Sequence, residues 1–179
     1  HEMFYNCKKL KNFGSFFDSI KTDITSDMSF LFCNCEQITS LELKFDNTIT
    51  RNMRGMFMNC FRLNTLILQN FKTNNVEIMW EMFKNCKSLT NLNLGSFDTS
   101  KVTDMESMFE GCSSLVSLSL TNFRTPNVRY MNKMFRDCTS LQSLYFNRIS
   151  SESLGTMQQM FYNCKSLKYL NIFSLTEKE

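Results

Sequence analysis

The fold is decided by residues 97–120, which read FDTSKVTDMESMFEGCSSLVSLSL. The most regular part of this pattern is Met-Phe-x-x-Cys, which recurs along the chain and has one variant with leucine in place of methionine. The copies end at Cys7, Cys35, Cys60, Cys86, Cys112, Cys138 and Cys164. From Cys60 onward the interval is 26 residues, and the two earlier intervals are 28 and 25. A period in this range is the signature of a stacked repeat protein.

The first half of each unit predicts a short helix. In one unit Val102, Met105, Met108, Phe109 and Cys112 fall within a stripe of about 120°, the width of one buried helix face. Good N-cap residues stand thirteen positions before the cysteines: Thr22, Asn47, Thr73, Thr99, Thr125 and Ser151. The residue before each cysteine is asparagine, aspartate or glycine, the types that tolerate a left-handed backbone at a helix end.

The second half of each unit predicts a short strand. Leu118 and Leu120 alternate with polar residues, as one buried face of a strand requires. Units stacked in register place equivalent strands about 4.8 Å apart in a parallel sheet. The sequence therefore predicts an α/β fold, a leucine-rich-repeat solenoid with short parallel strands on one face and short helices on the other. We expect one domain, residues 1–179, with about six to seven repeats. Because the chain begins inside a unit, we also expect it to be a fragment of a longer chain.

Composition argues against several classes of function. The 20 basic and 17 acidic residues are spread along all 179 positions, which disfavours a nucleic-acid partner. No apolar stretch approaches the roughly 18 residues of a membrane span, so we expect no direct membrane insertion in this segment. The single histidine is His1, and the five glycines form no phosphate-binding loop. We therefore expect no enzymatic activity, no catalytic residues, no metal and no cofactor.

Methionine and cysteine are interpreted as packing residues. Twelve of the 13 methionines fall at two predicted core positions of the unit, where they fill space. Seven of the eight cysteines share one position, which favours a ladder of buried, reduced thiols. A separation of about 4.8 Å also permits disulfides, so the redox compartment stays open. Cys33 lies outside this position, at a site filled in other units by Lys84, Glu110, Arg136 and Tyr162, and we expect it to be an exposed thiol.

Residues 97–105, followed by Met108-Phe109 and Gly111-Cys112, are similar to the consensus of BspA-like leucine-rich-repeat surface proteins with a 26-residue repeat. The similarity covers almost the whole chain. It implies a right-handed solenoid and a secreted or surface-anchored location, with adhesion to host tissue, matrix or other cells. It implies no catalytic residues, and the binding positions of such proteins vary between members.

The outward residues of the strands are the candidate binding surface. In the middle of the chain they are small, polar and uncharged, and we interpret that part as a solvated sheet face. At the C-terminal end Tyr145, Tyr169, Asn171 and Phe173 share this face, and aromatic side chains supply contact area at low entropic cost. An alternative is that Tyr169 and Phe173 pack against a further repeat. Trp80 is a second candidate contact, on the predicted outer helical surface.

The leading hypothesis is a non-catalytic leucine-rich-repeat interaction or adhesion module that is extracellular or on the cell surface. Its partner would be a protein or a glycan, and packing against further repeats or another chain is also expected. The alternative hypothesis is an architectural subunit of a large intracellular assembly. The cysteine column and the absence of any N-x-Ser/Thr glycosylation acceptor favour this alternative modestly.

Overall fold

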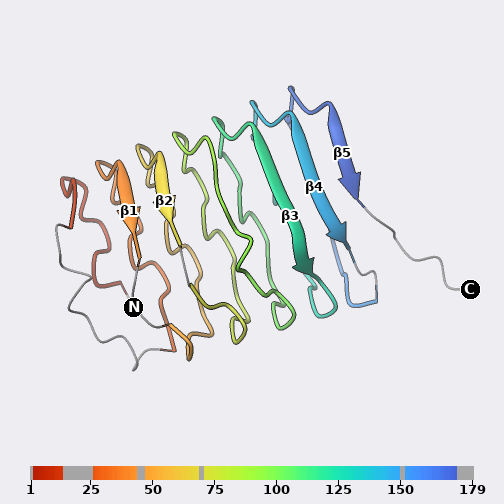
Figure 1. The fold of residues 1–179 in the computed structure, drawn as a ribbon, viewed down its shortest axis with the longest axis horizontal. Helices are drawn as coiled ribbons and strands as arrows, with labels where there is room; N and C mark the ends of the chain where they lie inside the picture. Colours follow the sequence, from red (N-terminus) through yellow and green to blue (C-terminus); the bar gives the residue numbers. More distant parts are fainter. Residues whose placement is uncertain (1, 14–25, 44–46, 69–70, 150–151, 173–179) are drawn as a thin grey trace, which may run out of the picture.

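The computed structural model describes residues 2–13, 26–43, 47–68, 71–149 and 152–172. The chain forms a row of similar coils, each lying beside the next (Figure 1). The strands all lie on one side of this row: β1 (Ser40–Glu42), β2 (Thr65–Ile67), β3 (Ser117–Arg124), β4 (Ser143–Arg148) and β5 (Tyr169–Ile172).

The strands pair in parallel and in the register that the repeat predicts. β1 pairs with β2, and a second sheet has the order β3-β4-β5. Within it, Ser117 lies opposite Ser143, and Ser143 lies opposite Tyr169. Each partner is thus one 26-residue unit further along, as predicted. Between the two sheets, residues 91–95 form no assigned strand, so the sheet is interrupted there.

The predicted helices are wrong. The described residues contain no helix, and each segment expected to be helical is a succession of tight turns. The backbone of Ser107 has φ 54° and that of Gly111 has φ 73°, a left-handed conformation that an α-helix does not contain. The amides of Met108 and Cys112 donate to carbonyls three residues earlier, at 3.3 and 3.1 Å, where a helix would bond four residues back.

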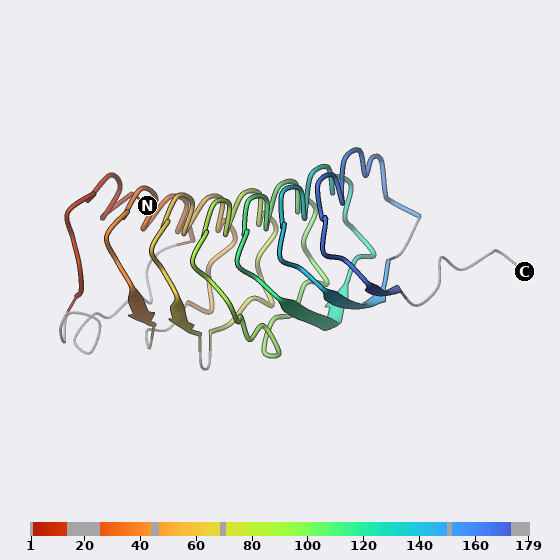
Figure 2. The ribbon, with the colours of Figure 1, turned by 90° about the horizontal axis from the view of Figure 1, so that it is seen from above.

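Bonding between coils explains why turns form in place of helices. The amide of Phe109 donates to the Met134 carbonyl at 2.9 Å, and that of Gly111 to the Arg136 carbonyl at 2.8 Å, both in the next coil. Packed helices need axes 8–10 Å apart, whereas stacked phenylalanine rings in this region lie 5.5–5.6 Å apart. Turns place an inward residue every three or four positions, so their apolar pattern imitates a helical stripe. Seen from above, the turns line one side of the row of coils and the strands line the other (Figure 2).

Three residues predicted to be helix N-caps, Asn47, Thr73 and Thr99, instead join neighbouring coils, whereas Thr22 and Ser151 lie outside the described residues. The Thr99 hydroxyl donates to the Arg124 carbonyl at 2.7 Å and accepts from the Arg124 amide at 2.8 Å. Thr73 makes the same pair of bonds with Asp98, at 2.9 and 2.7 Å. One coil earlier, the Asn47 side-chain amide makes the equivalent pair of bonds with the Lys72 backbone. The N-cap interpretation is wrong because these side chains bond across the stack, with no helix below them.

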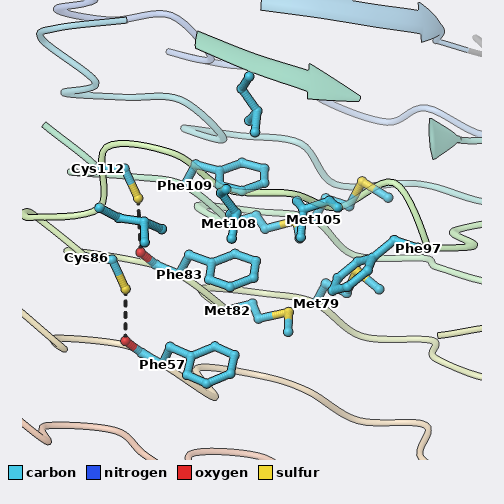
Figure 3. Packing of buried hydrophobic residues seen from close by; sticks show 14 of the residues in the cluster. Phe57, Met79, Met82, Phe83, Cys86, Phe97, Met105, Met108, Phe109 and Cys112 are labelled. Carbon is cyan, nitrogen blue, oxygen red and sulfur yellow. Dashed lines mark hydrogen bonds between the residues drawn. The ribbon is translucent and has the colours of Figure 1, made fainter. Parts of the chain in front are cut away.

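The core consists of aligned columns of identical side chains. Adjacent rings of the phenylalanine column are nearly parallel, with interplanar angles of 3–7°. Beside it, the thiol of Cys112 donates to the Phe83 carbonyl at 3.2 Å, and Cys86 does the same to Phe57 (Figure 3). None of the eight cysteines forms a disulfide, and of the seven in the predicted column five are buried, while Cys7 and Cys164 at its ends are half-buried.

Cys33 corrects one prediction. Its side chain has no exposed area, although we expected an exposed thiol. The equivalent side chains Lys84 and Glu110 are themselves only 26% and 16% exposed, so the shorter cysteine at this position is fully covered. Burial, with smaller contributions from the Glu81 and Glu2 carboxylates, raises the pKa of the Cys33 thiol to about 11.

The left-handed residue before each cysteine is confirmed. Asn59, Asn85 and Asp137 have φ between 60° and 61°. Their side chains also bond along the stack, since the Asn85 amide donates to the Asn59 amide oxygen at 2.9 Å. Gly111 interrupts this ladder because it has no side chain. A Cβ at this position would lie only 2.3 Å from the Asn85 Oδ1, so a larger residue does not fit here.

Candidate binding face

The exposed face of the sheet follows from the strand alternation. In β3 the side chains of Leu118 and Leu120 are buried, while those of Ser117, Ser119 and Thr121 are exposed. Backbone pairing with β4 fixes the position of each outward side chain along β3. The polar residues therefore form rows on a rigid support.

Two of the predicted contact residues lie together on this face. Tyr145 of β4 is 44% exposed and Tyr169 of β5 is 68% exposed. Tyr145 lies opposite Asn171, which is half-buried, so the two tyrosines are diagonal neighbours on adjacent strands. Phe173 lies outside the described residues. A contact role for this group stays a prediction.

Trp80 is placed differently from what we expected. It lies on the turn side of its coil, with no helix beneath it, and is half-buried. The guanidinium carbon of Arg54 lies 3.7 Å from the centre of its ring and 5.2 Å from that of Phe30. Much of the indole therefore serves a cation–π contact within the chain. Its role toward a partner stays a prediction.

A hollow of about 340 Å³ opens on the same face as Tyr145, where the sheet is interrupted. One wall is the segment that lacks a strand, and the other is β3. The lining consists of Asn91, Leu92, Asn93, Leu94, Gly95, Ser117, Ser119, Thr121 and Asn122. This lining contains no charged residue. The volume of the hollow lies at the lower end of the range for small-molecule sites, about 300–1,000 Å³.

Asn122 and Asn93 hold the two walls in place. The Asn122 side-chain amide donates to the carbonyls of Leu94, Gly95 and Phe97, at 3.2, 3.1 and 2.7 Å. The Asn93 Oδ1 accepts from the Gly95 amide at 2.9 Å. The Asn122 side chain thus joins the two walls of the hollow.

The opposite, turn side carries a half-buried ion-pair network. The Lys84 Nζ lies 2.9 Å from Glu81 Oε1 and 3.2 Å from Glu110 Oε2, and Arg136 Nε lies 3.3 Å from Asp137 Oδ2. Burial alone would lower the pKa of the Lys84 ammonium, but the two glutamates outweigh it and raise that pKa. The pairs of this network that link neighbouring coils both use Glu110, which contacts Lys84 in the coil before it and, at 4.0 Å, the Arg136 Nε in the coil after it.

The described residues offer no group of three or more metal-ligating side chains. None of the described segments forms a helix of the length and apolar character needed to cross a membrane. The buried thiols are poor nucleophiles, since burial raises the pKa of both Cys35 and Cys112 to about 12.

Comparison with protein families matches a model described as "Mycoplasma protein of unknown function, DUF285". The matches cover residues 1–115 and 52–174 and overlap, as a repeated unit produces. The chain belongs to the DUF285 family. No curated protein matches this DUF285 chain.

One solved structure similar to the DUF285 chain is a leucine-rich cell surface protein from Faecalibacterium prausnitzii A2-165. The two chains are 17% identical, with a TM-score of 0.34, which is too low to establish a shared fold. The match covers 97% of this chain and 62% of the other, so the DUF285 chain spans about three fifths of that protein's length.

Sequence reasoning missed the hollow. It treated Asn91, Asn93 and Gly95 as part of a continuous, solvated sheet. The available signal was their composition, because asparagine and glycine are depleted in strands. Three such residues at alternate positions of one unit mark the place where the sheet is interrupted.

Proposed function

We propose that this chain is a non-catalytic interaction module that binds a protein or glycan partner through its strand face, at an extracellular or cell-surface location. The observation that carries the proposal is the pair of exposed rings, Tyr145 and Tyr169, on a face whose strands are fixed by the stack. Tyrosine on a rigid backbone gives a large contact area with little loss of entropy. The resemblance of residues 97–112 to BspA-like surface repeats supports the location and an adhesive role.

The test is the binding of fluorescently labelled protein to an array of immobilised matrix proteins and glycans. We expect the double variant Tyr145→Ala, Tyr169→Ala to lose about thirtyfold or more in apparent affinity, because hot-spot tyrosines contribute more than about 1 kcal/mol each and about 1.4 kcal/mol corresponds to tenfold. Tyr130→Ala is the matched control, since Tyr130 is 47% exposed but lies on the turn side. Equal binding by the double variant and by the wild type would exclude the strand face as the contact surface.

A second candidate is an architectural subunit of an intracellular assembly. The observation in its favour is that all eight cysteines are free thiols, as in proteins kept in a reducing compartment. Thiol titration of freshly isolated native-source protein, under denaturing and non-reducing conditions, tests it. Eight reactive thiols per chain agree with this candidate, whereas fewer than eight count against it and favour export.

A further inference from the structure

The hollow beside β3 presents hydrogen-bonding groups of both kinds. The side-chain amides of Asn91 and Asn93, which line it, each carry a donating nitrogen and an accepting oxygen. The hydroxyls of Ser117, Ser119 and Thr121 each donate and accept. Of these, the structure gives only a 3.4 Å contact between Ser119 and Thr121. A ligand that enters the hollow thus meets mixed donors and acceptors at short intervals.

The absence of charge in the lining selects the class of ligand. A phosphate, a sulfated sugar or a carboxylate would need a cationic or strongly dipolar partner, and the lining contains no lysine or arginine. A cationic ligand would need a carboxylate, and the lining contains none. Neutral hydroxyl groups suit such a surface, because each one both donates and accepts a hydrogen bond.

An aromatic platform adjoins the hollow. Ser119, which lines it, lies opposite Tyr145 in the β3–β4 register, and the Tyr145 ring is exposed on the same face. A sugar ring has apolar C–H faces and a polar rim. A face that offers a tyrosine ring next to a polar, uncharged recess is complementary to both parts of such a ligand.

An added peptide strand fits this place poorly. Strands in a sheet lie about 4.8 Å apart, so a strand inserted between residues 91–95 and β3 would need flanking chains about 9.6 Å apart. The two coils are close to contact, since the Phe97 and Phe123 rings just below the surface lie 6.4 Å apart and nearly parallel. The hollow is therefore accessible from the solvent side of the sheet but too narrow for an inserted peptide strand.

We propose that this hollow, together with Tyr145, is a binding site for a short, neutral oligosaccharide. This inference deepens the proposed function and rests on it. The hydroxyls of one sugar ring occupy the recess between residues 91–95 and β3, and the next ring lies against Tyr145. Gly95 belongs to this wall because the absence of a side chain leaves its backbone accessible to the ligand.

The experiment is an NMR titration of ¹⁵N-labelled protein with three neutral trisaccharides: chitotriose, cellotriose and maltotriose. We expect saturable shifts at the amides of Asn91, Asn93 and Ser119 with at least one of them. Ser117→Trp fills the recess and should weaken this binding about tenfold or more, and Tyr145→Ala should weaken it several-fold. Ser40→Trp is the matched control, because Ser40 is exposed at the same repeat position in β1, away from the hollow.

The outcomes separate this proposal from the broader one. Absence of saturable shifts with all three sugars overturns the oligosaccharide site, as does binding that survives Ser117→Trp unchanged. If array binding still depends on the two tyrosines in that case, the interaction module stands and the sugar site alone fails. The amide spectrum of each variant outside the hollow shows that the stack remains folded, and Tyr145→Ala keeps the test decisive if Ser117→Trp does not fold.

Discussion

Replacing Thr99 by valine tests the idea that the buried polar column joins the coils. Valine has nearly the shape of threonine but lacks the hydroxyl. The change therefore removes both hydrogen bonds between this side chain and the Arg124 backbone, at 2.7 and 2.8 Å, and keeps the packing volume. Thr99 is fully buried, so water cannot replace the lost hydroxyl at its own position.

The size of the effect follows from those two bonds. Each contributes about 1 kcal/mol net, and an unmade bond at a buried group costs about 1–3 kcal/mol. The Arg124 residue is exposed, so water can reach part of its backbone and the lower figure applies. We expect the free energy of unfolding to fall by about 2 kcal/mol. For a chain of this size that corresponds to a decrease in Tm of about 4–8 °C.

Urea denaturation followed by circular dichroism measures this difference. Thr99→Ser keeps the hydroxyl and loses one methyl group, so it should cost about 0.8 kcal/mol. Thr65→Val is the control for an exposed threonine, and its effect should stay within about 0.5 kcal/mol. The reasoning is refuted if Thr99→Val is no more destabilising than Thr65→Val, or if Thr99→Ser is the worse of the two changes at position 99.

Two other predictions concern the thiol column and the tryptophan. Burial raises the pKa of the Cys112 thiol from 9.0 to about 12, so the folded state holds its proton more tightly than the unfolded chain does. This contribution to stability is complete below about pH 9 and is lost as the pH rises toward about 12. Urea titrations across that interval should therefore give a steeper fall for the wild type than for Cys112→Ala, and equal slopes would contradict the assignment. Replacing Arg54 by alanine uncovers the Trp80 ring, so the fluorescence emission should move to longer wavelength and acrylamide should quench it more strongly. An unchanged spectrum would show that the guanidinium does not cover the indole in solution.

The strand half of the unit could be predicted because its alternation of apolar and polar residues fits only one kind of structure. Leu118 and Leu120 alternate with serine, and only an extended chain buries every second residue. The turn half was predicted wrongly because the spacing of its apolar residues fits two kinds of structure. Met105, Met108 and Phe109 point inward at steps of three and one, which a helix and a chain of tight turns both produce. Hydrogen bonds to the next coil decide between them, and a periodicity within one unit does not contain that information.

The candidate site could be predicted only in its aromatic part. Tyr145 and Tyr169 are recognisable as outward residues from the strand period alone. The recess depends on the loss of pairing between residues 91–95 and β3, a property of two coils together. Thr99 shows the same limit, because a threonine at that position suits a helix N-cap and a bond across the stack equally well.

The bonding between coils has a consequence for how such a chain can vary in length. The Phe83 amide donates to the Met108 carbonyl, and the Phe109 amide donates to the Met134 carbonyl, both at 2.9 Å, so successive coils use the same bonds. A duplicated coil would therefore find the partners it needs on both sides, and a deleted one would leave two coils that can still pair. The binding face can gain or lose one row of outward side chains in this way while the remaining rows keep their supports.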